Sequence, residues 1–254
     1  MAEQADAQVS KTCDGNIMWV RFPLPALMRR KPKKVIRWSF ELAYVVGLIT
    51  TDGNLSKDNR HITLTSTDRQ LLCTFKCCLG KNNRITENTP TKRFRKKAFK
   101  VQLSDVTFYD FLIKIGLFPN KSLTIGELKI PQKYFVDFLR GHLDGDGSII
   151  YYKDRYNSYL NPKYVYDRLF IYFISASKKH VKWLQKNIIK LKKIHGNIEC
   201  LKFKTKTNNP FYRLKFSTKE AKIILNSIYY KNNLPCLLRK YQIAKPFLVP
   251  SSLN

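Results

Sequence analysis

The stretches FELAYVVGLITTDG (40–53) and YFVDFLRGHLDGDG (134–147) decide the fold of this chain. Each is an apolar stretch of helical character that ends in Asp-Gly, the first at Asp52 and the second at Asp146. The two aspartates lie 94 residues apart, which leaves room for one small α+β lobe after each motif. A tandem duplication of one structural unit explains this spacing better than chance.

The segments downstream of each motif follow the same order of strands and helices. Alternating apolar and polar residues predict strands, and amphipathic runs predict helices. The second copy has a longer first hairpin, at about residues 150–168. The predicted strands are 61–67, 99–104, 169–175, 199–206 and 211–217, and the predicted helices are 68–80, 106–118, 178–194 and 218–230.

These patterns divide the chain into four parts. Residues 1–39 form a basic N-terminal extension with several prolines, which is either an arm that lies on phosphates or a leader without a role. The first repeat spans residues 40–133 and the second spans 134–245, and a C-terminal tail follows at 246–254.

The charge balance points to a polyanionic partner. The chain of 254 residues has 47 Lys and Arg against 18 Asp and Glu, a net charge of +29. Nucleic acid is the first candidate and an anionic membrane surface is the second. A lysine-rich composition inherited from an AT-rich genome is the alternative. We expect no signal peptide, because the first dozen residues are polar, and no membrane helix, because no apolar run is long enough.

The cysteines and histidines favour neither a disulfide framework nor a zinc site. None of the six cysteines forms a CxxC pair, and the four histidines are scattered. We expect Cys73, Cys77 and Cys78 to be buried thiols of one helix. The pattern suggests an intracellular, reducing compartment, and it leaves open an organelle or a prokaryotic cytoplasm.

The predicted strands have one polar and often cationic face. In 211–217, Arg213 and Lys215 lie opposite Leu214 and Phe216, and the other strands follow this pattern. Such faces suit phosphates and base edges in the major groove, although an ordinary solvated sheet face is the alternative. The further residues of these faces are Thr63, Thr65, Lys100, Gln102, Lys202, Lys204 and Lys206.

The glycines of the two motifs predict a close helix pair. We expect Gly53 and Gly147 to end the helices in the left-handed conformation. Gly47 and Gly141 lie on the helices themselves, where a small residue lets another backbone approach.

If the two helices pack through Gly47 and Gly141, Asp52 and Asp146 converge. Each aspartate then lies at the negative end of its helix dipole, where a carboxylate is disfavoured. Divalent cations between the two carboxylates relieve that repulsion, and hard cations such as Mg²⁺ prefer oxygen ligands. Two acids, metal ions and a basic surface together indicate metal-assisted phosphodiester hydrolysis.

The sequences VVGLITTDG (45–53) and LRGHLDGDG (139–147) resemble the nine-residue motif of the LAGLIDADG homing endonucleases, of the monomeric two-repeat type. The resemblance covers about residues 40–245. It implies an α+β fold of two pseudo-symmetric αββαββα repeats, with curved antiparallel DNA-binding sheets and paired motif helices at the interface. Thr50, Arg140 and His142 depart from the family pattern, and the last two leave the helix packing open.

The resemblance also implies a catalytic site. Asp52 and Asp146 would bind Mg²⁺, with Mn²⁺ or Ca²⁺ as substitutes for binding, and the backbone carbonyls of Thr51 and Gly145 would be further ligands. Lys121 and Lys240 would supply a basic group beside each acid, unless they are ordinary DNA-backbone contacts. Lys129 and Arg239 are nearby substitutes. Further expected DNA contacts are Ser56, Lys57, Arg93, Arg95, Ser148, Tyr151 and Lys153.

The function implied is that of a monomeric homing endonuclease, intron-encoded or free-standing. It would cut double-stranded DNA at a long asymmetric target, since the two repeats differ. One alternative keeps the fold without cleavage, as an RNA maturase acting on a host intron RNA or as a non-cleaving DNA-binding protein. A cationic ribosome-associated protein is the third class. Retention of both acids favours the enzyme.

Overall fold

The computed structural model describes residues 35–88, 97–201 and 210–249. The DNA contacts predicted at Arg93, Arg95, Lys202, Lys204 and Lys206 lie outside the described residues, as does most of the predicted N-terminal extension. The described end of that extension, residues 35–39, has no regular structure. Its Trp38 ring packs on Phe111 at 5.3 Å, and the Ser39 hydroxyl caps the first helix by accepting a hydrogen bond from the backbone N–H of Leu42.

The order of elements confirms the predicted duplication. Each half begins with a motif helix and continues through two strands, a helix, two strands and a helix. The first half contains α1 (Phe40–Thr51), β1 (Gly53–Leu55), β2 (His61–Ser66), α2 (Arg69–Leu79), β3 (Ile85–Asn88), β4 (Ala98–Ser104) and α3 (Val106–Lys114). The second half contains α4 (Phe135–Asp144), β5 (Ser148–Asp154), β6 (Tyr166–Ser175), α5 (Lys178–Lys192), β7 (Asn197–Leu201), β8 (Phe211–Phe216) and α6 (Thr218–Ile228).

Short helical segments close each half. The 3-10 helices η1 (Lys121–Leu123) and η2 (Gln132–Tyr134) follow α3, and α7 (Leu238–Ala244) and η3 (Lys245–Phe247) follow α6. The segment predicted as a C-terminal tail starts in η3, and its described part lies against α6. There Asn226 accepts a hydrogen bond from the backbone N–H of Val249 at 2.7 Å and donates one to the Phe247 carbonyl at 3.1 Å.

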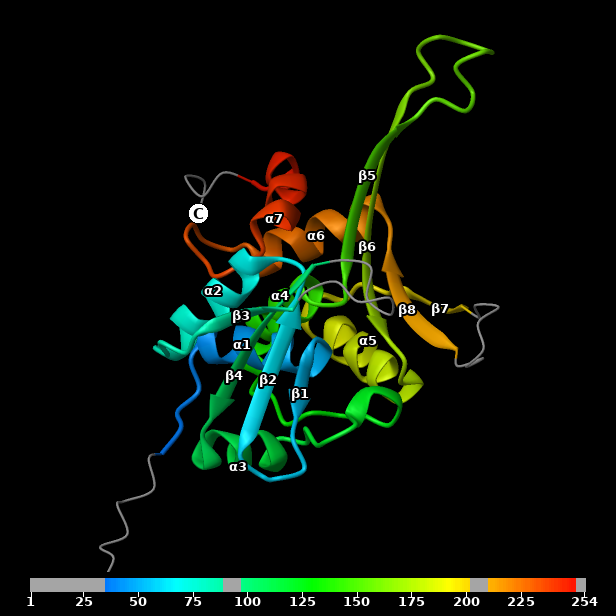
Figure 1. Ribbon diagram of the computed structural model, residues 1–254. Coiled ribbons are helices and arrows are strands. Elements are labelled where there is room, and N and C mark those ends of the chain that lie inside the picture. The colour runs from blue at the N-terminus through cyan, green and yellow to red at the C-terminus, as the bar shows by residue number, and fades with distance from the viewer. Residues whose placement is uncertain (1–34, 89–96, 202–209, 250–254) are drawn as a thin grey trace, which may run out of the picture. The chain divides into compact units, whose positions relative to one another are not determined.

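The two sheets have the same topology, which Figure 1 shows as two separate sets of strands. The order is β1-β2-β4-β3 in the first sheet and β5-β6-β8-β7 in the second, and every neighbouring pair is antiparallel. One face of each sheet is apolar and buried against helices, α2 and α3 in the first half and α5 and α6 in the second. The protein is therefore an α+β molecule of two similar lobes.

Helices α1 and α4 pack against each other between the two lobes. A Cβ atom added at Gly47 would lie 2.3 Å from the Phe138 carbonyl oxygen, and one added at Gly141 would lie 2.0 Å from the Tyr44 carbonyl oxygen. Real Cβ atoms do not approach so closely, so only glycine allows these two backbones to meet. The close helix pair predicted from the motifs is confirmed.

The expected role of the other two motif glycines is wrong. Neither Gly53 nor Gly147 has a positive φ, so they do not end the helices in the left-handed conformation. They are needed for space instead, because the chain folds back over the last helical turn. A Cβ at Gly53 would lie 2.6 Å from Ile49 Cα, and one at Gly147 would lie 2.8 Å from Leu143 Cα.

The expected burial of the cysteines in α2 is also wrong. Cys73 and Cys77 are exposed and Cys78 is half-buried. The helix is amphipathic, and its buried stripe consists of Leu71, Leu72 and Phe75. None of the helices among the described residues is long and apolar enough to cross a membrane.

Candidate active site

The two motif aspartates lie at the adjoining ends of α1 and α4. Asp52 is the C-cap of α1, whereas α4 stops one residue earlier, so Gly145 is its C-cap and Asp146 follows. A Cβ atom added at Gly145 would lie 1.9 Å from Thr51 Oγ1 and 3.0 Å from Asp52 Oδ2. The end of each motif therefore packs against the end of the other, and this brings the carboxyl group of Asp52 beside the second motif.

Both carboxyl groups are held where a negative charge is disfavoured. Burial is the main reason that the pKa of Asp52 rises to about 7, and repulsion from Asp146 adds to it. Desolvation by the surrounding protein also raises the pKa of Asp146, although this residue keeps an exposed surface. The ammonium groups of Lys240 and Lys121 act on both acids in the opposite direction. The site is thus a coupled group of two acids and two bases.

Lys121 and Lys240 occupy equivalent places in the two halves. Lys121 starts η1 and donates to the carbonyl oxygen of Gly53, and Lys240 lies in α7 and donates to that of Gly147 at 2.6 Å. Both side chains are buried, and burial lowers the pKa of each to about 8. Buried amines held by motif carbonyls differ from exposed DNA-backbone contacts.

The two basic residues that could replace Lys121 and Lys240 in this role lie in exposed positions. Lys129 is exposed, and Arg239 forms an exposed ion pair with Asp68 at 3.0 Å. The Lys240 ammonium in contrast lies within hydrogen-bonding distance of four carbonyl oxygens of the second motif, those of Leu143, Asp144, Gly145 and Gly147, at 2.6–3.1 Å, and its three N–H groups are shared among them. These contacts fix α7 against the end of α4.

The oxygen atoms at the helix ends fit a hard cation. Within the described residues, no group of three or more His, Cys, Asp or Glu side chains could hold a metal ion. Asp52 and Asp146 offer two carboxylates that repel each other, and the carbonyls predicted as further ligands, of Thr51 and Gly145, lie one residue before them. Mg²⁺ typically takes few carboxylates and completes its shell with phosphate and water, so this donor set suits it.

Arg140 and His142, which depart from the family motif, are both buried in α4. Arg140 is fully buried, and its guanidinium donates to the carbonyls of Pro235 at 2.9 Å and Ile228 at 2.7 Å and to Asp137 at 2.8 Å. It therefore joins α4 to the segment between α6 and α7. His142 stacks on His180 at 5.3 Å, and burial keeps its pKa well below the ordinary value, so the ring is neutral.

Asp144 is a buried acid to which our sequence interpretation gave no role of its own. Its Oδ2 accepts from the Tyr44 hydroxyl at 2.9 Å and from the backbone N–H of Leu237 at 2.7 Å, just before α7. Burial raises its pKa to about 6. Thr50 occupies the equivalent place in the first motif and donates to its own helix at the Val46 carbonyl. The asymmetry between Thr50 and Asp144 was visible in the sequence, and it marks which motif anchors α7.

The first sheet presents a polar face opposite its core. Its core side carries Ile62, Leu64, Val101 and Leu103, all buried. The register places several of the predicted DNA contacts on the other face, with Thr63 opposite Gln102 and Thr65 opposite Lys100. Ser56 follows β1 at a half-buried position, and Lys57 is exposed in the turn after it.

The second sheet has an aromatic and cationic face. The register places Lys215 beside Tyr172, and Arg213 lies two residues along on the same face. Lys215 Nζ lies 5.0 Å from the Phe170 ring, and the Arg213 guanidinium lies 4.7 Å from the Tyr172 ring. Glu199 contacts both cations and so reduces the positive charge of this face.

Three predicted contacts in β5 divide between the two faces. Tyr151 and Lys153 share the face of buried Ile149, and the Tyr151 ring packs on Phe247 at 5.0 Å. Ser148 belongs to the face of Lys215 and Arg213, together with exposed Tyr152, which pairs in register with Arg168. Tyr152 therefore shares the face of Lys215, whereas the predicted Tyr151 lies on the other face, because successive residues of a strand point to opposite sides of the sheet.

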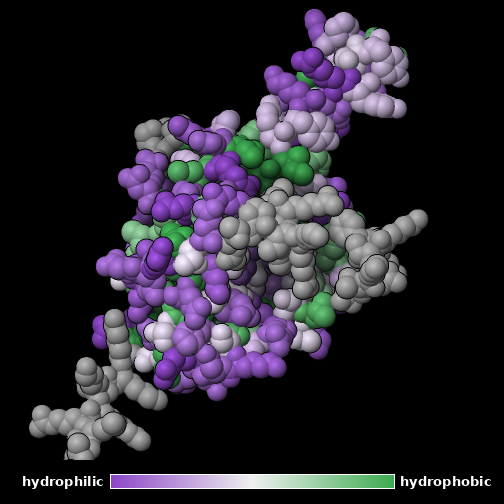
Figure 2. Space-filling model, in the orientation of Figure 1, coloured by the Kyte–Doolittle hydropathy of each residue, from purple (hydrophilic) through white to green (hydrophobic). Residues whose placement is uncertain are grey.

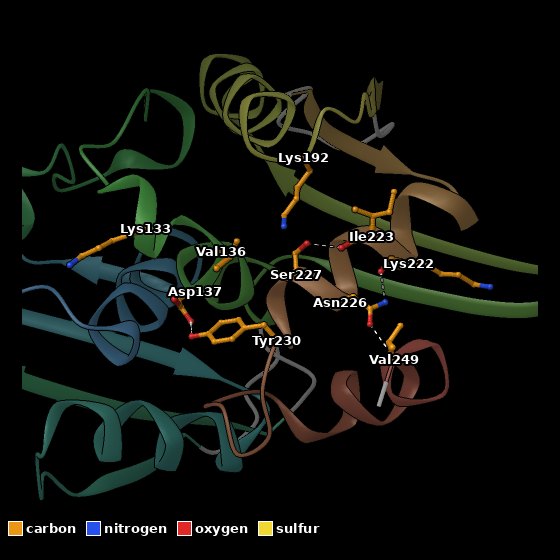
Figure 3. A pocket seen from close by; sticks show the side chains of 10 residues that line it. All are labelled: Lys133, Val136, Asp137, Lys192, Lys222, Ile223, Asn226, Ser227, Tyr230 and Val249. Atoms are coloured by element: carbon orange, nitrogen blue, oxygen red, sulfur yellow. Dashed lines mark hydrogen bonds between the residues drawn. The ribbon is translucent and has the colours of Figure 1, made fainter. Parts of the chain in front are cut away.

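A separate groove of about 760 Å³ lies beside α4 and α6 (Figure 3). Lys192 extends toward Ser227 of the groove, whereas Lys133 and Lys222 extend outward. Asp137 accepts from Tyr230 in this groove and is also paired with Arg140. The residues that line it include neither motif aspartate and neither site lysine, so the groove is distinct from the carboxylate site.

Comparison with known proteins agrees with this geometry. Residues 39–116 match the model of the LAGLIDADG-like domain. The structure of the meganuclease I-SmaMI bound to uncleavable DNA superimposes with a TM-score of 0.52 at 13% identity, over 81% of this chain and 86% of that one. This protein has the LAGLIDADG fold. A search of the curated proteins found no match to this chain.

Two other solved structures are similar at lower scores. Full-length DUF199/WhiA from Thermatoga maritima is 18% identical with a TM-score of 0.49, over 87% of this chain, which spans 66% of that protein. I-DmoI in complex with DNA and Ca is 14% identical with a TM-score of 0.47, over 81% of this chain and 97% of that one. At these identities the similarity concerns the fold alone.

Proposed function

We propose that this LAGLIDADG protein is a monomeric, site-specific DNA endonuclease that hydrolyses phosphodiester bonds with Mg²⁺. This proposal is supported chiefly by the site at the ends of α1 and α4, where the charges of two buried lysines act on two carboxylates whose pKa values are raised. A protein that only binds DNA has no need for Asp52 and Asp146 in this costly arrangement.

The aspartates and the lysines of the site would have different roles in catalysis. Asp52 and Asp146, with the carbonyls of Thr51 and Gly145, would hold the divalent cation. Such a cation polarises a phosphoryl oxygen and lowers the pKa of bound water. Lys121 and Lys240 remain protonated at neutral pH, since their pKa values are about 8. Their charge would stabilise the additional negative charge of the phosphate transition state.

The two sheets and the net charge of +29 support duplex DNA as the substrate. The first sheet offers hydroxyl, amide and ammonium groups that suit base edges and phosphates. The second offers Arg213, Lys215 and Arg168 beside aromatic rings. Because the two faces differ chemically, the target would be asymmetric, and one chain would contact both halves.

A cleavage screen tests the proposal. The protein is incubated with a randomised duplex library and Mg²⁺, and cut ends are sequenced. We expect double-strand breaks at one asymmetric sequence. Asp52→Asn and Asp146→Asn should each abolish cutting while the affinity for that sequence in Ca²⁺ is kept. Sequence-specific binding without cleavage in Mg²⁺ or Mn²⁺ would instead assign the fold a binding role.

A further inference from the structure

The β5–β6 hairpin is an extension that the first repeat lacks. Strands β5 and β6 contain 7 and 10 residues, whereas the equivalent β1 and β2 contain 3 and 6. The connection between β5 and β6, residues 155–165, is also longer than the turn between β1 and β2. In Figure 1 the end of this hairpin extends well beyond the rest of the second lobe. We call residues 154–166 the hairpin tip.

The hairpin tip carries aromatic side chains that are exposed and are not packed into the hydrophobic core. Tyr156 is 82% exposed and Tyr159 is 76% exposed, and Tyr164 and Tyr166 are also exposed. The Tyr164 and Tyr166 rings stack on one another at 6.5 Å. In the space-filling view the same region stands clear of the surface around it (Figure 2). Exposed aromatic rings on a projecting loop are available to a partner.

Local hydrogen bonds hold the loop in shape. Asp154 accepts from the backbone N–H of Tyr156 at 3.0 Å, and Asn161 accepts from that of Lys163 at 2.9 Å. The Asn157 carbonyl accepts from the backbone of Leu160 at 3.1 Å. These are side-chain and backbone turns of the kind that Asp and Asn favour. The tyrosines are therefore carried on a series of defined turns.

The charge of the hairpin favours an anionic partner. Its two acids are already engaged, because Asp154 pairs with Arg168 at 3.0 Å and Asp167 accepts from the Tyr151 hydroxyl at 2.7 Å. Arg155 and Lys163 are exposed beside the tyrosines. An aromatic surface flanked by cations suits a ligand that has both flat rings and phosphates.

We propose that the hairpin tip binds the unpaired bases of single-stranded nucleic acid. Tyr156, Tyr159 and Tyr164 would stack on bases, and Arg155 and Lys163 would contact the phosphates. Stacking needs an unpaired base, because the bases of a duplex are already stacked on their neighbours. This activity would add to contacts with duplex DNA, which the polar face of the first sheet suits better.

Binding measurements with matched ligands test this proposal. The full-length protein is titrated, in a chelator, against fluorescently labelled oligo(U) RNA, oligo(dT) DNA and a duplex of mixed sequence. We expect the triple variant Tyr156→Ala/Tyr159→Ala/Tyr164→Ala to lose affinity for single strands by about tenfold or more. Its affinity for the duplex should change by less than about twofold.

Two control variants separate stacking from other causes. Phenylalanine at the same three positions keeps the rings and should bind single strands as the wild type does, whereas leucine keeps apolar surface and should fail. All three positions are exposed, so the melting temperature should not change. Preference for RNA over DNA would identify an RNA loop as the ligand, and equal affinity would identify any single strand.

Three outcomes would overturn the proposal. One is a wild type that binds single strands no better than the alanine variant does. The second is an equal loss on duplex and single strands, which would make the tip an extension of the duplex surface. The third is a leucine variant with full affinity. Because no cleavage is measured, these results stand apart from the endonuclease proposal.

Discussion

At the scale of single residues, the charged form of Asp52 lowers the free energy of unfolding of the protein. Its folded pKa of about 7 is far above the ordinary value of 3.8, so the folded protein binds the proton more tightly than the unfolded chain does. The stabilisation from this proton is complete below about pH 4 and is lost as the pH rises through 7. In the absence of metal, the charged carboxylate of Asp52 therefore lowers the stability of the fold at neutral pH.

Asp52→Asn should consequently stabilise the metal-free protein. The amide imitates the neutral carboxyl group, so thermal melting in a chelator should show a melting temperature several degrees above that of the wild type at pH 8, since about 1 kcal/mol corresponds to about 2–4 °C. The difference should disappear near pH 4. Adding Mg²⁺ should raise the melting temperature of the wild type more than that of the variant. A variant less stable than the wild type at pH 8 would contradict the assignment of a disfavoured charge.

At the scale of elements, the α1–α4 contact depends on two glycines. Gly47→Ala and Gly141→Ala each place a methyl group inside the opposite backbone, so the helices must separate. We expect each change to destabilise the protein by about 1–3 kcal/mol, and to reduce cleavage more strongly, because both aspartates move apart with the helices. Gly126→Ala is the matched control, since a Cβ there meets nothing within 4 Å. Equal melting temperatures for Gly141→Ala and Gly126→Ala would disprove the close contact.

How far the sequence predicted these elements depended on the range of the interaction concerned. Local periodicity predicted the alternation of helices and strands in each repeat without marking β1 or β3, the full αββαββα order came from the family resemblance, and the glycine spacing sufficed for the α1–α4 contact. The sequence could not show that Gly53 and Gly147 must lack a side chain to fit against the preceding helical turn, because that depends on how the chain folds back over the helix. The sequence also could not show that Tyr152, rather than the predicted Tyr151, shares the face of Lys215, since the strand alternates without marking which face the helices cover.

The roles of the site residues depend on contacts far apart in the chain. Lys121 and Lys240 were predicted from the family resemblance, and the structure adds their bonds to motif carbonyls. Nothing in the local sequence of α4 indicated that Arg140 would reach Ile228 and Pro235, or that Asp144 would bond to the backbone before α7. Those contacts cross about ninety residues, and periodicity has no information at that range.

At the scale of the whole molecule, the position of the helices relative to the sheets predicts which lysines meet DNA. Lys100 lies on the outer face of the first sheet, whereas exposed Lys186 lies on α5, which covers the inner face of the second. Duplex DNA on the sheet faces would contact Lys100 and not Lys186.

Affinity for duplex DNA should therefore be measured across salt concentrations. The logarithm of the binding constant falls with the logarithm of salt concentration in proportion to the number of phosphates contacted. Lys100→Ala should reduce that slope by about one phosphate contact, and Lys186→Ala should leave it unchanged. Both substitutions remove one charge from a protein of net charge +29, so a general effect of charge would lower both slopes equally. A loss confined to Lys186→Ala would place the DNA on the helical side and reverse the proposed orientation.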